Sequence, residues 1–176
     1  MIAFYKAEIG GDEHSEYFSR YINLASSASF SEQIEENTAR INALFSGLSA
    51  RQLSYRYAPG KWTLAEVIGH MLDTERIFCY RALRAARNDS TPLPGFEQDG
   101  YVTYGNFNKY KKDDLIMEYS AVRLGTATLF EYMGKEELCR KVVVEGNNLS
   151  ARAAAFIIIG HELHHLNIIN QKYLKQ

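Results

Sequence analysis

The sequence has little proline and little cysteine. Only three prolines occur in 176 residues, Pro59, Pro92 and Pro94. Because proline ends or kinks a helix, the stretches between them remain long enough for helices. The two cysteines, Cys79 and Cys139, form no CxxC pair. We expect them to be reduced, partly buried thiols in a reducing compartment.

An excess of charge and a long apolar run are also missing. The chain has 20 Lys and Arg residues against 21 Asp and Glu residues, a net charge of −1. This charge provides no overall electrostatic attraction for nucleic acid or an anionic membrane. The longest apolar run, Ala153–Ile159, is far shorter than a membrane span. The first residues include acidic ones and lack the apolar core of a secretory leader. We therefore expect a cytoplasmic protein that binds neither nucleic acid nor membrane.

The length and the hydrophobic content fit one globular domain. A chain of 176 residues, 46% hydrophobic and 23% charged, can bury a core without cross-links. The sequence predicts a single domain over residues 1–176, in which residues 1–29 form an N-terminal extension packed on the rest.

Apolar residues at helical spacing predict four long helices. At the start of the second, Thr63 and Glu66 form a capping-box pattern directly before an apolar run. The middle of the fourth, Ala153–Ile159, is apolar on every side, so this helix is expected to be buried all round. The expected helices cover roughly Glu32–Gly47, Thr63–Arg87, Lys112–Met133 and Ser150–Tyr173.

Shorter elements complete the predicted fold. A short helix is expected over about Glu13–Leu24, and Val142–Val144 is expected to form a strand or an extended hairpin arm. Asn88–Tyr110 is rich in proline, glycine and aromatic residues, and we predict an ordered loop that covers the mouth of a pocket. The fold class is therefore all-α: an antiparallel four-helix bundle with a long ordered loop between helices 2 and 3. Bundles of this kind build metal sites from facing side chains.

A pair of histidines on the fourth helix carries the chemistry. His161 and His165 are four residues apart, so a helix places both rings on one face, one turn apart. Imidazole suits zinc, nickel, copper or iron. The pair with Glu162 also matches the HExxH motif of metalloproteases. That interpretation fails because only eleven residues follow His165, and none of them is His, Asp or Glu.

A third ligand must therefore lie upstream of the pair. His14 lies in a polar segment and is expected to be solvated, whereas His70 lies inside the second helix. His70 is roughly 120° from the centre of that helix's apolar face, at a flank that could line a pocket between helices. On spacing alone, a role as a partly buried structural residue explains His70 better than metal binding does. His164 points away from the pair.

Acidic residues near these histidines have ordinary explanations too. Asp73 and Glu75 could orient a ligand imidazole, but salt bridges with Arg76 or Arg81 explain them at least as well. Glu66 fits its capping role. Trp62, at the start of the second helix, is expected in the core.

Two stretches resemble the DinB/YfiT-like superfamily of bacterial metal-binding bundles. The first is Tyr57–Val102, with its PGKWT segment followed by Glu66, His70 and Asp73, and the second is Gly160–Ile169, with the HxxxH pair. The resemblance covers the chain from about residue 30 to the end. It implies an up-down-down-up or similar four-helix bundle, often a homodimer, in which His70, His161 and His165 bind one divalent metal ion, zinc or nickel being expected. The family's pattern does not require Glu162.

The same resemblance suggests an activity. Some members are similar to transferases or isomerases that use a low-molecular-weight thiol such as bacillithiol or mycothiol, and others to metal-dependent hydrolases. We therefore expect a metal-dependent thiol S-transferase acting on small electrophiles. The alternatives are a hydrolase, for which Asp73, Glu97 and Asp99 are the candidate bases, and a non-enzymatic metal-binding stress-response protein.

Overall fold

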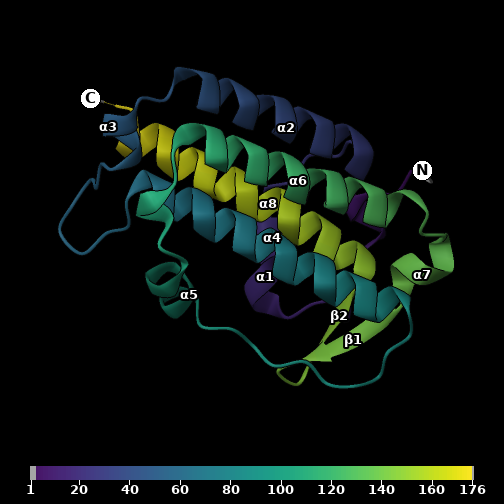
Figure 1. Cartoon of the computed structure of the whole chain (residues 1–176). Helices are drawn as coiled ribbons and strands as arrows, with labels where there is room; N and C mark the ends of the chain where they lie inside the picture. Colours follow the sequence, from purple (N-terminus) through teal and green to yellow (C-terminus); the bar gives the residue numbers. More distant parts are fainter. Residues whose placement is uncertain (1–2, 176) are drawn as a thin grey trace.

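The computed structural model describes residues 3–175, and its architecture is a four-helix bundle (Figure 1). The all-α fold class predicted from the sequence is confirmed, with a single two-stranded hairpin added in the described part of the chain. The predicted helix bounds hold to within two residues at most ends. The long helices are α2 (Phe30–Gly47), α4 (Leu64–Ala86), α6 (Lys112–Glu131) and α8 (Ala151–Ile168). A π-helical segment of five residues, Ile169–Tyr173, continues α8.

The helix directions explain the length of the connection between α4 and α6. In Figure 1, α4 and α6 run the same way, and α2 and α8 run the opposite way. The chain must therefore return along the whole bundle between α4 and α6, while α4 keeps α8 as its antiparallel neighbour. This is the up-down-down-up order implied by the family resemblance.

The return segment contains a helix where the sequence predicted an ordered loop. Its aromatic and glycine content favoured loop structure, but Glu97 accepts hydrogen bonds from the backbone N–H groups of Asp99 and Gly100 and so caps a short helix. Asn106, in the left-handed region with φ of 55°, ends it. The short elements are α1 (Glu16–Ile22), α3 (Ala50–Leu53), α5 (Gln98–Gly105), α7 (Lys135–Cys139), β1 (Lys141–Val144) and β2 (Asn147–Ser150).

The capping box predicted for α4 is present. The side chain of Thr63 accepts a hydrogen bond from the backbone of Glu66, and Glu66 accepts one from the backbone of Thr63. Ser29 and Glu32 form the same motif at the start of α2, so that helix begins at Phe30 rather than at Glu32. The predicted extended arm is β1, which pairs antiparallel with β2 in the register Val142 opposite Leu149.

The helix α8 lies at the centre of the bundle. Every residue of Ala153–Ile159 is buried, as its uniform apolarity predicted. No helix within residues 3–175 has both the length and the apolar character needed to cross a membrane.

The helix α1 packs directly against α8 and α8 has a glycine at the contact. A Cβ built on Gly160 would lie 1.9 Å from the carbonyl oxygen of Tyr21, so only glycine lets the two backbones approach this closely. The N-terminal helix is shorter than predicted, beginning at Glu16 rather than Glu13. Glu13 is instead buried before the helix, where its carboxylate accepts hydrogen bonds from Arg152 and from the backbone of Gly10.

Candidate metal centre

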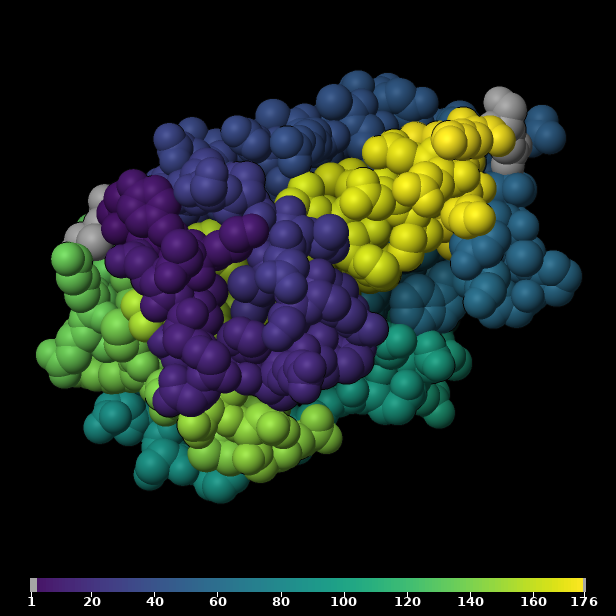
Figure 2. Space-filling model, turned by 180° about the vertical axis from the view of Figure 1, so that it is seen from behind, coloured from purple at the N-terminus to yellow at the C-terminus, as the bar shows by residue number. Residues whose placement is uncertain are grey.

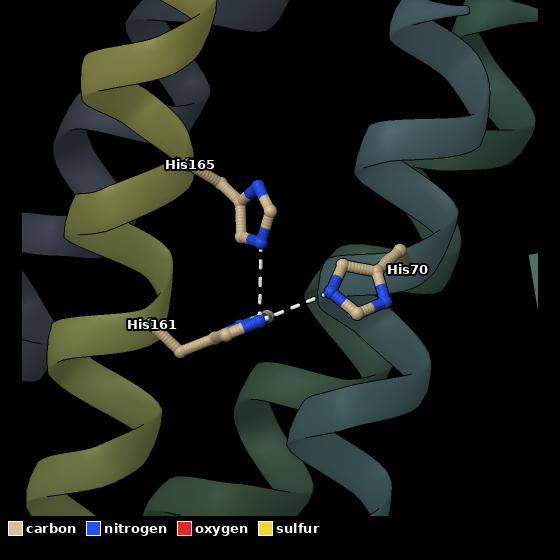
Figure 3. A group of neighbouring side chains, drawn as sticks. All are labelled: His70, His161 and His165. Carbon is tan, nitrogen blue, oxygen red and sulfur yellow. Dashed lines mark hydrogen bonds between the residues drawn. The ribbon is translucent and has the colours of Figure 1, made fainter. Parts of the chain in front are cut away.

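Three imidazole rings converge between α4 and α8. The Nε2 atom of His161 lies 3.1 Å from Nε2 of His70 and 3.1 Å from Nε2 of His165 (Figure 3). One ligand atom from each ring lies within 4.8 Å of both others. The structure thus brings together the three histidines singled out from the sequence.

The His70 side chain is buried because neighbouring elements cover the flank of α4 on which it lies. It lies at the flank of the apolar face of α4, and its side chain is only 4% exposed. The ring points toward α8 and lies 4.9 Å from the ring of Trp62. Thr74 and Arg81, on the same stripe of α4, are buried as well. The flank is therefore an inner surface, which helical periodicity alone could not show.

The two short contacts at His161 cannot both be hydrogen bonds. In neutral imidazole one ring nitrogen carries a single hydrogen and the other a single lone pair. The Nε2 atom of His161 can therefore either donate once or accept once, yet it faces two nitrogens at 3.1 Å. Three imidazole nitrogens bound to one tetrahedral ion at the usual bond length lie about 3.3 Å apart. The donor set and its spacing fit a divalent metal ion.

All three rings are neutral at physiological pH. Burial lowers the pKa of His70 to about 4, assisted by the charge of His164. Burial, and then the neighbouring histidines, hold the pKa values of His161 and His165 well below the ordinary value. Neutral imidazole is the form that binds a metal, because its lone pair is free. The cluster is therefore ready for an ion without losing protons.

The acidic residues near the histidines are used elsewhere. Glu75 and Glu162 both accept hydrogen bonds from Nη2 of Arg123, at 2.9 and 2.5 Å, in a buried ion-pair cluster. Burial raises the pKa of Glu162 to about 7 against the attraction of Arg123. Asp73 pairs with Arg76. The salt-bridge interpretation was thus correct in kind, although the partner of Glu75 is Arg123 and not Arg76 or Arg81.

The two remaining histidines lie outside the cluster. His164 is half-buried, its ring 5.5 Å from that of Tyr21. His14 is half-buried rather than fully solvated, with Nδ1 2.9 Å from the carbonyl oxygen of Ser15. Neither belongs to a group of potential metal ligands within residues 3–175.

A pocket of about 800 Å³ opens onto the histidines. His70 and His161 line it, together with residues 95–98 of the return segment. Part of the segment predicted to cover the mouth of a pocket, residues 95–98, thus lines this pocket. Further lining residues come from α1 and its N-cap and from the β1–β2 hairpin: Ser15, Tyr17, Phe18, Tyr21, Val144, Glu145, Asn147, Asn148 and Leu149.

The contact between α1 and the histidine cluster was not predicted from the sequence. The Tyr21 ring makes an edge contact with His161, 5.3 Å between ring centroids. Figure 2 shows residues of the N-terminal segment, in purple, lying across the α8 side of the molecule. Tyr21 belongs to a helix distant in sequence from both metal-site stretches. Only a glycine at position 160, next to His161, hints at another backbone passing close by.

Comparison with known proteins places the fold and the family. A sequence profile described as the DinB superfamily matches residues 33–169. The chain belongs to the DinB superfamily. The resemblance stated from the PGKWT segment and the HxxxH pair is therefore confirmed.

Relatives of this DinB-superfamily chain carry related names. A protein of Oceanobacillus iheyensis called "Putative metal-dependent hydrolase" is 25% identical over 76% of this chain and 78% of its own. A protein of Geobacillus thermodenitrificans with the same description is 25% identical over 64% of each chain. The names state a metal-dependent activity for those proteins.

Solved structures share the fold at low identity. YfiT from Bacillus subtilis, described as having "an unusual four-helix bundle topology", matches with a TM-score of 0.71 and 14% identity over 93% of this chain and 90% of its own. A mycothiol-dependent maleylpyruvate isomerase matches with a TM-score of 0.66 and 11% identity, over 93% of this chain and 62% of its own. At these identities the likeness shows the fold alone.

The cysteines of this DinB-superfamily chain are not nucleophiles of the pocket. The Sγ atom of Cys79 lies 3.1 Å from the hydroxyl oxygen of Thr126, Cys79 is not among the residues that line the pocket, and burial raises its pKa to about 12. Cys139 is exposed, which corrects the expectation that both thiols are partly buried. Cys139 is the last residue of α7, and a helix of five residues is too short for apolar periodicity to show which of its side chains face solvent.

We expect the two thiols to differ sharply in reactivity. At pH 8 a thiol with a pKa near 12 is on the order of 10⁻⁴ thiolate, and thiolate is the reactive form. A disulfide reagent such as DTNB should therefore label Cys139 rapidly and Cys79 only on unfolding. In Cys139→Ser the fast phase should vanish. A fast phase that survives this substitution would contradict the assignment.

Proposed function

We propose that the chain binds one divalent metal ion on His70, His161 and His165. The observation that carries the proposal is the position of one buried nitrogen, Nε2 of His161, at 3.1 Å from two others. Zinc or nickel is the expected ion, because both favour imidazole nitrogen. Three protein ligands leave a coordination position open, as in catalytic sites. The metal-dependent names of the relatives support the same proposal.

We propose further that the site serves a metal-dependent thiol S-transferase acting on small electrophiles. A divalent ion held by the three histidines would lower the pKa of a thiol that binds there. The thiol must come from a cosubstrate, since Cys79 is protonated and lies outside the pocket wall. The sulfur forms a bond to the electrophilic carbon, the leaving group departs with its electron pair, and the thiol proton passes to water at the pocket mouth.

Apolar side chains in part of the pocket wall support this chemistry. Phe18, Phe78 and Phe96 line the cavity, and Ile157 faces it from α8. The rings of Phe18 and Phe78 pack edge to face at 5.3 Å. Apolar walls leave a thiolate poorly solvated, and a poorly solvated nucleophile gains from reaction with a carbon centre. The ring of Tyr21 holds His161 from the α1 side.

Within residues 3–175 no carboxylate lies in ligand contact with the histidines, which makes hydrolysis the second choice. Hydrolytic sites usually contain a carboxylate base close to the reacting water. In residues 3–175, no carboxylate joins the histidine group. Of the candidate bases, Asp73 pairs with Arg76, and the oxygens of Glu97 accept the backbone N–H groups of Asp99 and Gly100. Hydrolysis remains the second candidate because the two relatives carry that name.

Cobalt substitution tests the proposal. The protein is loaded with Co²⁺, and its visible spectrum is followed while mercaptoethanol, cysteine or ethanol is added. We expect both thiols to produce an intense sulfur-to-cobalt charge-transfer band and ethanol to produce none. The matched variant His165→Ala should lose the cobalt spectrum.

Three other outcomes distinguish the alternatives. A cobalt spectrum that ignores thiols but changes with pH in the neutral range favours hydrolysis by activated water. A spectrum that changes neither with added thiol nor with pH indicates a closed coordination shell around the cobalt ion. The non-enzymatic metal-binding role is then the better description. No cobalt binding by the wild-type protein would refute the metal site itself.

A further inference from the structure

The pocket that contains the histidines also contains a buried cation. Arg81 lines the same cavity and is only 4% exposed. Its Nη2 atom donates a hydrogen bond to the carbonyl oxygen of Pro94, at 3.3 Å. Within residues 3–175, no carboxylate lies close enough to form an ion pair with it. A buried charge without a partner is costly, and proteins rarely keep one without use.

The second buried arginine of the bundle shows what a purely structural solution looks like. Arg123 is 5% exposed, and it meets the carboxylates of Glu75 and Glu162. Arg81 is buried to a similar degree but has no carboxylate at ion-pair distance within residues 3–175, and Glu145 attracts it only from farther away. Glu145 lines the same pocket, but it is exposed at the hairpin turn and forms no ion pair with Arg81. The difference between the two arginines calls for an explanation outside the packing of the helices.

The guanidinium group of Arg81 is held by aromatic rings and a carbonyl. Its Cζ atom lies 5.0 Å from the ring centroid of Phe78 and 5.7 Å from that of Phe96. Two rings and the carbonyl oxygen of Pro94 fix the group while leaving most of its N–H donors free. A fixed guanidinium with free donors is the preferred partner of a carboxylate or a phosphate.

Arg81 and the histidines lie at two ends of one cavity. Arg81 follows His70 by three turns of α4, so the two share a stripe of the helix and their Cα atoms are about 16 Å apart along its axis. Thr74 and Phe78 lie between them and line the same pocket. A ligand that reaches both ends must be elongated, and the ring of Phe78 gives it an apolar middle.

We propose that Arg81 binds the anionic end, a carboxylate or a phosphate, of an elongated substrate whose other end reaches the three histidines. This inference rests on the proposed function for what happens at the histidine end. The anion site itself does not need the metal. The substrate class is therefore a small molecule with one anionic group, an apolar middle and a reactive or metal-binding group at the far end.

Metal-free protein tests the anion site separately from the metal. Octanoate, octyl phosphate and octanol are titrated into the apo protein by calorimetry. We expect the better of the two anions to bind at least about tenfold more tightly than octanol. The reason is that a charge-assisted hydrogen bond from Arg81 to the anion should add at least about 1.4 kcal/mol to the binding free energy, which equals this tenfold difference. The comparison of octanoate with octyl phosphate then identifies the preferred anion.

Substitution of Arg81 supplies the decisive comparison. Arg81→Met keeps most of the side-chain length and should abolish the preference for the anions over octanol. The matched control is Arg84→Met on the same helix, because Arg84 pairs with Asp89 and does not line the pocket. If Arg81→Met does not fold, Arg81→Lys replaces it, and severalfold weaker anion binding is expected because the planar donor is lost. Equal binding of the anions and octanol by the wild-type protein, or wild-type anion affinity in the folded variant, overturns the inference.

The cobalt-loaded protein separates the two hypotheses. Mercaptooctanoate should bind more tightly than mercaptooctanol, as followed by the charge-transfer band, and Arg81→Met should equalise them. If no thiol perturbs cobalt while octanoate binding still requires Arg81, the proposed function fails and the anion site stands. If both thiols bind equally in wild type and variant, the thiol site stands and the role of Arg81 fails.

Discussion

His161→Ala should reduce the metal content of the purified protein from about one ion per chain to less than about a tenth. Nε2 of His161 lies between those of the other two histidines, 3.1 Å from each, so its removal leaves a two-ligand site shared by two helices. Loss of an outer partner of a metal ligand alone weakens binding about 10–100-fold. Loss of a ligand should therefore cost at least about a hundredfold in affinity. The measurement is elemental analysis of protein purified without a polyhistidine tag, followed by a Co²⁺ titration.

His164→Ala is the matched control for this prediction. His164 lies on the same helix and is also a histidine, but it is half-buried and outside the ligand group. Its variant should retain metal at the wild-type level. A chelator should lower the melting temperature of wild type and of His164→Ala, because a ligand bound only to the folded state stabilises it, and should leave His161→Ala unchanged. Equal metal in all three proteins would refute the site.

Gly160→Ala should destabilise the fold by about 2–3 kcal/mol and move α1 away from α8. The new Cβ would lie 1.9 Å from the carbonyl oxygen and 2.4 Å from the carbonyl carbon of Tyr21, and a backbone cannot rotate out of the way as a side chain can. Displacement of α1 also takes the ring of Tyr21 from His161. Urea denaturation measures the loss in stability, and the cobalt spectrum reports the change at the site.

Gly125→Ala is the companion substitution. Gly125 is an exposed residue of α6, and a Cβ there would meet nothing within 4 Å. Alanine is favoured over glycine in a helix by about 0.8–1 kcal/mol, so this variant should be at least as stable as wild type. If both alanine variants had the same stability, close packing of α1 on α8 would not be the cause of any loss.

Local patterns were enough to predict the helices of the bundle. The caps at Ser29 and Thr63 act within four residues of chain, and the uniform apolarity of Ala153–Ile159 reports burial without reference to any partner. The spacing of His161 and His165 also predicted a shared face, because a turn of helix sets that distance. In residues 88–110 the high content of proline, glycine and aromatic residues favoured a loop, and the prediction therefore missed the helix α5, which Glu97 caps.

Four features of the chain were thus determined by the sequence itself: the helical periods, the caps, the paired histidines on α8 and the family motifs. Each depends on residues within a few turns of one another, and local geometry is the same in any fold. The tertiary structure alone decided that the flank of α4 bearing His70 faces α8, that α1 covers His161, and that Arg81 shares a cavity with the histidines. These depend on how α1, α4, α8 and the return segment pack together, and no local spacing specifies contacts between side chains so distant along the chain.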